Sequence, residues 1–212
     1  MTVLGDALTR AIKALSETDV SFALVGGLAV SVRAEPRFTR DVDLVVAVSD
    51  DTHAERVTFS LIQDGYTLLA SIEHERTGRL ATVRMSATDD DRSTVIDLLF
   101  ASTGIEPEIA GAAETLDVLP GVQIPVARVG HLIASKLLAR DDDRRPSDRA
   151  DLLALGHVAA DHDWIDASEA VSMITDRGYH RDRDLSAALA ALRVEIDPGP
   201  DDRFPDRPHG AR

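Results

Sequence analysis

The chain has 212 residues and a formal net charge of −14, from 23 Lys and Arg against 37 Asp and Glu. Hydrophobic residues make up 44% of it, which is enough for a folded core and excludes a wholly disordered chain. The chain contains no cysteine, so disulfides, thiolate zinc sites and cysteine nucleophiles are excluded. The acidic balance argues against a general nucleic-acid coat protein, because such proteins carry clustered basic charge.

The sequence predicts neither a membrane span nor a secretion signal. No uninterrupted apolar run approaches the roughly 20 residues that a membrane helix needs. The stretch 1–20 lacks the basic segment followed by an apolar segment that is typical of a signal peptide. We therefore expect a soluble cytoplasmic protein with no membrane partner.

Helical and strand patterns alternate over the first hundred residues. Apolar residues that recur at three- and four-residue steps predict helices, and short apolar runs bounded by turn residues predict strands. The predicted order is helix 2–17, strand 21–25, helix 28–33, strand 41–48, helix 50–63 and strands 66–70, 80–85 and 94–100. This order indicates a mixed sheet with helices packed on it, an α/β (α+β) fold.

Helical patterns dominate after residue 104. The predicted elements are a helix at 105–116, an extended link or edge strand at 121–126, and helices at 129–140, 147–160, 164–177 and 182–194. The stretch 197–212 holds four prolines among polar and charged residues, which predicts a disordered tail. We therefore divide the chain into an α/β domain at 1–127, a helical C-terminal region at 128–196 and the tail at 197–212.

A glycine pair ends the first predicted strand. Gly26 and Gly27 follow the run FALV and precede a helix. Glycines allow backbone amides to come close to a phosphate, and the helix N-terminus favours an anion. The alternative is an ordinary turn, since glycine pairs are common in turns.

Two aspartates open the next apolar strand, DVDLVV. Because strand side chains alternate, Asp41 and Asp43 point to one face and Val42 and Leu44 to the other. Neighbouring carboxylates repel each other, and a divalent cation removes the conflict, with Mg²⁺ or Mn²⁺ suited to oxygen ligands. The alternative is a solvated strand start with two exposed aspartates.

A third aspartate lies inside the apolar strand STVIDLLF. Burying the charge of Asp97 in such a strand costs free energy unless the carboxylate binds a metal ion or pairs with another group such as an arginine. If strands 41–48 and 94–100 are neighbours, Asp41, Asp43 and Asp97 form a cluster. Three carboxylates could hold two metal ions, the arrangement used for in-line phosphoryl or nucleotidyl displacement.

One of only two lysines lies in the middle of an apolar helix. Lys136, in LIASKLLA, has a stem long enough to cross the edge of the core and present its ammonium group to phosphates. The alternative is that it reaches out to solvent. Asp148 and Asp151 share one helical face and could orient Lys136 or a ribose hydroxyl; Asp148 could also be a first-turn residue favoured by the helix dipole.

These motifs together resemble the nucleotidyltransferase superfamily with the DNA polymerase β-like fold. The resemblance rests on Gly26-Gly27 followed, after thirteen residues, by Asp41-Val42-Asp43-Leu44. The block 37–43 is similar to the R-x-T-x-D-x-D block of the AbiEii-type toxin, or MenT-like, branch. The segments 131–140 and 145–152 look like that branch's lysine-bearing helix and its R-x-x-D-x-x-D-L block. One difference is Gly27, where the superfamily often has serine.

The resemblance implies a function and a set of site residues. Residues 1–127 would be the nucleotidyltransferase catalytic domain, transferring NMP from an NTP to an acceptor with Mg²⁺, or Mn²⁺ in its place. The chain would be a toxin with a cognate antitoxin and a tRNA acceptor. Catalytic, metal-binding residues would be Asp41, Asp43 and Asp97, and nucleotide-binding residues Gly26, Gly27, Arg40, Lys136 and Asp148.

The acceptor and the activity leave alternatives. Arg33, Arg37 and Arg40 would form a basic rim for an RNA in an otherwise acidic protein. The acidic surface also fits a small cationic acceptor such as an aminoglycoside. A third possibility is a catalytically silent nucleotide-binding module that keeps the fold.

Overall fold

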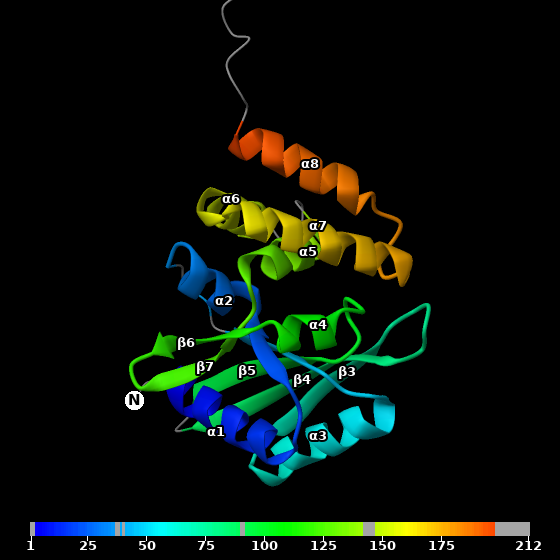
Figure 1. Cartoon of the computed structure of the whole chain (residues 1–212). Helices are drawn as coiled ribbons and strands as arrows, with labels where there is room; N and C mark the ends of the chain where they lie inside the picture. Colours follow the sequence, from blue (N-terminus) through cyan, green and yellow to red (C-terminus); the bar gives the residue numbers. More distant parts are fainter. Residues whose placement is uncertain (1–2, 37–38, 40, 90–91, 142–146, 198–212) are drawn as a thin grey trace, which may run out of the picture.

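A computed structural model describes residues 3–36, 39, 41–89, 92–141 and 147–197. The expectations for Arg37, Arg40 and most of the tail, 198–212, lie outside these residues. Within them, the chain forms a sheet with helices on both faces (Figure 1), which confirms the predicted α/β class.

The sheet has seven strands in the order β3-β4-β5-β2-β1-β7-β6. Strands β1–β7 and β2–β5 pair in parallel, and all other neighbours are antiparallel, so the sheet is mixed as predicted. The strands in chain order are β1 Phe22–Val25, β2 Asp41–Val46, β3 Thr67–Glu73, β4 Leu80–Asp89, β5 Arg92–Leu99, β6 Glu114–Leu119 and β7 Val122–Val126. Strand β2, which carries the paired aspartates, is the central one.

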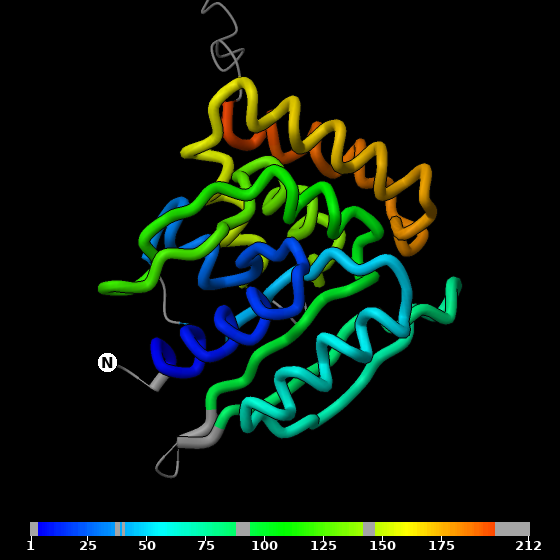
Figure 2. The backbone as a smooth tube through the Cα atoms, turned by 60° about the horizontal axis from the view of Figure 1, so that its bottom comes forward, coloured from blue at the N-terminus to red at the C-terminus, as the bar shows by residue number. Residues whose placement is uncertain are grey.

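Two helices cover one face of the sheet. Helices α1 (Val3–Glu17) and α3 (Asp51–Gln63) run side by side there (Figure 2). The apolar side chains of the central strands that point to this face, including Val42, Leu44 and Leu98, are fully buried. This face is therefore the main hydrophobic core.

The other face carries α2 (Gly26–Arg33), α4 (Glu106–Gly111) and α5 (Val129–Ala139), with a further helical layer beyond α5 (Figure 1). That layer consists of α6 (Ser147–Val158), α7 (Asp161–Asp176) and α8 (Leu185–Ile196). Helix α5 packs against α6, α7 and α8, so it lies between them and the sheet. None of the helices within the described ranges is long and apolar enough to cross a membrane.

The segment 105–126 differs from the sequence-based prediction. The predicted helix 105–116 ends at Gly111, and residues 114–119 form β6 instead. The segment at 121–126 is not an edge strand, because β7 pairs with both β1 and β6. The apolar spacing suits a helix locally, but pairing with β7 across the turn at Gly121 makes residues 114–119 a strand.

Candidate functional site

A row of side chains crosses four strands at the centre of the sheet. The register places Arg84 of β4 beside Asp97 of β5, Asp97 beside Asp43 of β2, and Asp43 beside Val25 of β1. Directly paired residues point to the same face, so Arg84, Asp97 and Asp43 all face α5. Strands β2 and β5 are neighbours, and the aspartates on them lie on one face, as the sequence analysis required.

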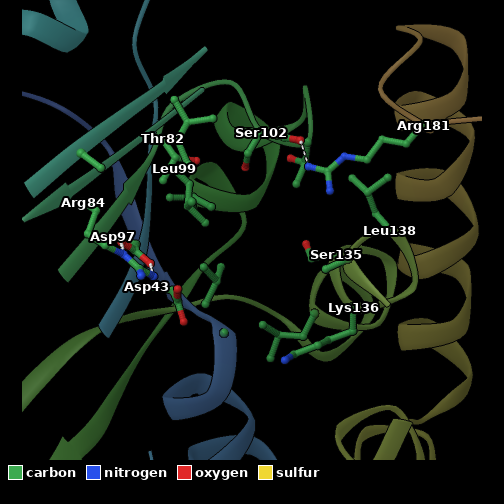
Figure 3. A pocket seen from close by; sticks show the side chains of 18 residues that line it. Asp43, Thr82, Arg84, Asp97, Leu99, Ser102, Ser135, Lys136, Leu138 and Arg181 are labelled. Carbon is green, nitrogen blue, oxygen red and sulfur yellow. Dashed lines mark hydrogen bonds and ion pairs between the residues drawn. The ribbon is translucent and has the colours of Figure 1, made fainter. Parts of the chain in front are cut away.

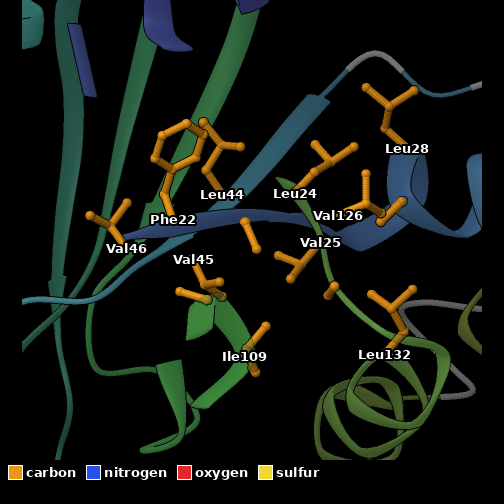
Figure 4. Close-up of a cluster of buried hydrophobic side chains, with 14 of the residues drawn as sticks. Phe22, Leu24, Val25, Leu28, Leu44, Val45, Val46, Ile109, Val126 and Leu132 are labelled. Carbon is orange, nitrogen blue, oxygen red and sulfur yellow. The ribbon is translucent and has the colours of Figure 1, made fainter. Parts of the chain in front are cut away.

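The same strands separate this row from the core. Val25 and Val45 point toward α4 and α5, whereas Leu24 and Leu44 point to the opposite side (Figure 4). Asp43 is half-buried between Val42 and Leu44, which are fully buried. Strand alternation therefore places the carboxylates and the α1–α3 core on opposite faces of the sheet.

Gly26 makes room for Asp43. Gly26 has φ of +65°, in the left-handed region that favours glycine. A Cβ atom at this position would overlap Oδ2 of Asp43 and lie 2.6 Å from its Cγ. The first glycine of the pair thus serves two needs, the turn from β1 into α2 and the close approach of the Asp43 carboxylate.

Asp97 pairs with an arginine that the sequence analysis did not identify. Arg84 donates from Nε to Asp97 Oδ1 at 2.8 Å and from Nη2 to Oδ2 at 2.6 Å (Figure 3). Asp97 is buried, and the Arg84 side chain is half exposed. The hydrogen bond to Asp97 raises the pKa of Arg84 above its usual range, and the charges of Asp97, Asp41 and Asp43 raise it further.

The acidic row fits a divalent cation in part. Asp41 and Asp43 share a face of β2, and Gly26 leaves space beside Asp43. Among the side chains that the structure describes, however, no three His, Asp or Glu residues are arranged to hold one metal ion. The difference from the expected three-carboxylate set has a physical cause, since the β4–β5 register puts Arg84 directly beside Asp97.

Lys136 is buried and held by two aspartates. Its Nζ lies 2.8 Å from Asp148 Oδ1 and 2.7 Å from Asp151 Oδ2. All three residues are nearly inaccessible to solvent, so the lysine does not reach out to solvent. The predicted orienting role of the two aspartates agrees with this geometry, and Asp148 faces Lys136 rather than solvent at the start of α6.

A cavity of about 590 Å³ lies between the sheet and α5. Asp43, Arg84 and Asp97 line it on the sheet side, and Ser135 and Lys136 line it on the helix side (Figure 3). Its volume is in the range of small-molecule and cofactor sites. The cavity brings together the acidic row, the glycine turn at Gly26 and the buried lysine.

Polar groups complete the cavity wall. Ser135 points into the cavity (Figure 3), and its buried Oγ has no hydrogen-bond partner among the described residues. Ser102 and Thr103, in the loop after β5, also line the cavity. Glu106 fixes that loop, since its Oε1 accepts hydrogen bonds from the backbone N–H of Ser102 at 2.7 Å and of Thr103 at 2.6 Å.

The turn between α7 and α8 closes the far end of the cavity. Arg181 projects from this turn and donates to the backbone oxygen of Ser102 at 3.3 Å (Figure 3). The turn packs on the β3–β4 hairpin, where Arg76 donates a hydrogen bond to the backbone oxygen of Arg177. The ring centroids of His74 and Tyr179 lie 4.4 Å apart at the same contact. A second cavity of about 770 Å³ shares Thr82, Ser102 and Arg181 with the first.

The structure brings most of the expected site residues together. Gly26, Asp43, Asp97 and Lys136 line the cavity. Asp41 lies two residues from Asp43 on the same strand face, Asp148 contacts Lys136 from outside the cavity lining, and Gly27 is buried in the first turn of α2. Arg40 lies outside the described residues.

The expected basic rim loses one member. Arg33 donates to the backbone oxygens of Ala127 at 2.9 Å and Val126 at 3.0 Å, and it pairs with Glu114 at 2.7 Å. These contacts fasten α2 to β6 and β7 and use the guanidinium for structure. Its position at the end of α2, away from the cavity lining, is not visible in the local sequence.

Sequence reasoning missed three cavity residues. Only a weak feature of the sequence marks Arg84 as a site residue, namely a charged side chain at a polar position of the alternating strand LATVRMSA. Ser135 adjoins the lysine that was identified. No feature of the local sequence marks Arg181, because its place in the cavity depends on how the α7–α8 turn docks on the sheet.

Comparisons with known proteins agree with this geometry. A family model, described as the nucleotidyl transferase AbiEii toxin of type IV toxin–antitoxin systems, matches residues 7–208. No curated protein matches the chain significantly. An antigenic nucleotidyltransferase-like protein from Paracoccidioides brasiliensis has a similar structure, with TM-score 0.54 and 15% identity over 94% of this chain and 99% of that one.

A further solved structure is similar at a lower level. The lincosamide antibiotic adenylyltransferase LnuA with lincomycin bound has TM-score 0.48 and 15% identity over 75% of this chain and 100% of that one. The fungal structure shows the fold, and the family model spans almost the whole chain. The protein is a nucleotidyltransferase, and it belongs to the family of AbiEii nucleotidyl transferase toxins of type IV toxin–antitoxin systems.

Proposed function

We propose that the chain transfers NMP from an NTP to an acceptor hydroxyl in the cavity between β2 and α5, as the toxin of a toxin–antitoxin pair with tRNA as acceptor. The observation that carries the proposal is the contact between Gly26 and Asp43 at the floor of the cavity. It joins a glycine turn suited to phosphates with a carboxylate suited to a cation.

The polar groups of the cavity support nucleotide binding. Lys136 lines the cavity opposite the acidic row, and its ammonium, which Asp148 and Asp151 hold by two contacts, would donate its third N–H to a phosphate oxygen. Ser135 supplies a buried hydroxyl with no partner among the described residues, and an unsatisfied buried group of this kind favours a ligand. Gly27 at the start of α2 adds a backbone N–H at a helix N-terminus.

The reaction needs positioned groups rather than a covalent intermediate. The acceptor oxygen forms a bond to the α-phosphorus while the bond from that phosphorus to the pyrophosphate oxygen breaks. The acceptor proton passes to a carboxylate of the acidic row, and Lys136 stabilises charge on the phosphates. Asp41 and Asp43 would hold the Mg²⁺, or Mn²⁺, which neutralises phosphate charge when bound.

The second cavity supports a site for the acceptor. It adjoins the first, because Thr82, Ser102 and Arg181 line both cavities, so an acceptor there would lie next to the cavity that holds Asp43. The family assignment favours a toxin, and a toxin with an RNA acceptor follows from the resemblance described above.

The net charge of −14 favours a second candidate, a cationic small molecule such as an aminoglycoside.

The decisive experiment replaces the β2 aspartates with their neutral amides. Asp41→Asn and Asp43→Asn should each reduce transfer of label from α-³²P NTP to total RNA by at least about a hundredfold, because charge stabilisation at the phosphates is lost. Asp117→Asn, which removes an exposed aspartate of β6, is the matched control and should keep full transfer. Undiminished transfer by Asp43→Asn would disprove the proposed site.

The acceptor is identified by where the label appears. Incubation with each of the four α-labelled NTPs, together with total RNA and a panel of aminoglycosides, compares the two candidates directly. Label on tRNA supports the toxin reaction, and label on the drug supports the cationic acceptor. Nucleotide binding without transfer to either would support a silent binding module.

A further inference from the structure

Both oxygens of the Asp97 carboxylate accept hydrogen bonds from one side chain. Arg84 contacts both of its oxygens, at 2.8 Å and 2.6 Å, in the forked geometry that makes arginine–carboxylate pairs strong. Asp97 is only 7% exposed. A buried carboxylate needs a positive partner, and here the neighbouring strand provides it within the sheet itself.

Arg84 also lies close to the other two carboxylates. Asp43 is the direct strand neighbour of Asp97, and Asp41 is two residues away on the same face. Because an arginine side chain stays protonated in proteins, all three carboxylates lie close to a fixed positive charge. A metal ion shared by the three carboxylates would lie beside this fixed cation, and the like charges would repel each other.

We propose that Arg84 takes the place of a metal ion beside Asp97, so that the site binds one divalent cation, through Asp41 and Asp43, instead of two. Three carboxylates against one guanidinium leave an excess of two negative charges, which one divalent cation balances. Asp97 is then a positioning residue that holds Arg84 at the cavity wall, where the guanidinium can face phosphate oxygens.

This inference rests on the proposed function, because it concerns the cation of the same site. It differs from the three-carboxylate set that the sequence suggested. The competing account is that Arg84 leaves Asp97 when metal ions arrive, in which case Asp97 becomes a ligand. The two accounts make opposite predictions for the loss of the Asp97 charge.

Binding of Mn²⁺ separates the accounts without measuring activity. The full chain is titrated with Mn²⁺ alone, and again with the α,β-methylene analogue of the NTP that supports transfer, while free Mn²⁺ is followed by its EPR signal. Asp97→Asn should keep a stoichiometry of one and lose much less affinity than Asp43→Asn, because it removes a neighbouring charge and not a ligand. Asp43→Asn should weaken binding by at least about tenfold, the usual scale for disturbing a metal site.

Substitution of the arginine gives the second measurement. Arg84→Gln releases Asp97 and should raise the Mn²⁺ stoichiometry toward two. Arg79→Gln is the matched control, since it removes one positive charge from the residue just before the same strand, where Arg79 pairs with Asp51 at 3.4 Å. The double variant Arg84→Gln/Asp97→Asn leaves no buried carboxylate unpaired and should bind one Mn²⁺ like the wild type.

Several results would overturn the inference. The first is a loss of Mn²⁺ affinity in Asp97→Asn as large as that in Asp43→Asn. The second is a wild-type chain that binds two Mn²⁺ ions or none. The third is an Arg84→Gln variant whose Mn²⁺ stoichiometry is the same as that of the wild type. The proposed function is judged separately, by label transfer in the Asp43→Asn variant. Transfer that depends on Asp43 together with two bound Mn²⁺ would leave the function standing and remove this inference alone.

Discussion

Gly26 and Asp43 are in such close contact that residue 26 has no room for a Cβ atom. Asp43 lies on β2, and Gly26 follows its strand partner Val25 at the point where β1 turns into α2. A nucleotide that contacts the glycine turn therefore also lies beside the first carboxylates of the acidic row. This contact makes glycine necessary here for a reason other than backbone flexibility alone.

Gly26→Ala is predicted to abolish nucleotide transfer. The alanine Cβ would push the Asp43 carboxylate out of place, and the positive φ adds a strain of roughly 1 kcal/mol. Gly78→Ala is the matched control, since Gly78 has the same φ of +65° but no atom within 4 Å of an added Cβ. Thermal unfolding should show the strain of the positive φ in both variants and a further loss of stability in Gly26→Ala, where the added Cβ meets Asp43. Label transfer should be lost only in Gly26→Ala; equal transfer by the two variants would refute the role of the contact.

Lys136→Met is predicted to destabilise the protein by about 3–5 kcal/mol, because Asp148 and Asp151 lose their shared buried cation. The triple variant Lys136→Met/Asp148→Asn/Asp151→Asn removes all three charges and should recover most of that loss in urea unfolding. If Lys136 binds phosphates, the folded triple variant should still fail to bind NTP. Wild-type NTP affinity in the triple variant would show that the lysine is purely structural.

Glu106→Gln is predicted to lower the free energy of unfolding by about 1–3 kcal/mol, because hydrogen bonds to a buried charge are replaced by weaker neutral ones. It should also raise the KM for NTP, since Ser102 and Thr103 lose their anchor at the cavity wall. Urea unfolding and steady-state kinetics test both effects. Glu55→Gln, on an exposed position of α3, is the control and should change neither.

His131 is predicted to make stability depend on pH. Burial lowers its pKa below 6.5, and Asp166, Glu108 and Glu169 oppose that shift while Arg128 adds to it. Because the unfolded chain binds the proton more readily, the free energy of unfolding should fall as the pH drops below about 6.5. His131→Leu removes this contribution, so its loss of stability between pH 7 and pH 5 should be smaller than that of the wild type in urea titrations.

Protonation of Glu108 and Glu114 does not contribute to the stability change measured between pH 7 and pH 5. Arg177 lowers the pKa of Glu108 and Arg33 lowers that of Glu114, so the stability they contribute is lost only as the pH falls below their ordinary value of 4.5. The interval between pH 7 and pH 5 therefore reports mainly on histidines. An identical pH response in His131→Leu would rule out His131 as the titrating group.

Strand periodicity made the acidic face predictable, but register did not follow from it. Alternation in DVDLVV places Asp41 and Asp43 on one face wherever the strand lies in the sheet. The alignment of Asp43 with Asp97, and of Asp97 with Arg84, depends on how three separate strands pair. The sequence alone leaves open whether the partner of Asp97 is a metal ion or an arginine. The β4–β5 pairing places Arg84 beside it.

The two misses have different physical causes. Residues 114–119 carry a local helical pattern, and only their pairing with β7 makes them a strand. Arg181 enters the cavity because a turn with two left-handed residues, Arg181 and Asp182, docks on a hairpin more than a hundred positions earlier in the chain. The first feature is a local hairpin whose pairing outweighs the helical spacing, whereas the second depends on contacts between distant segments that no short window of sequence contains.

The alternation of strand β2 links correct folding to chemistry. Val42 and Leu44 fill the core on one side while Asp41 and Asp43 face the cavity on the other. A slip of one residue would exchange these faces and place two carboxylates against α1 and α3. Selection for a stable protein and selection for an active one therefore act on the same alignment, and chains misaligned at β2 lose both properties at once.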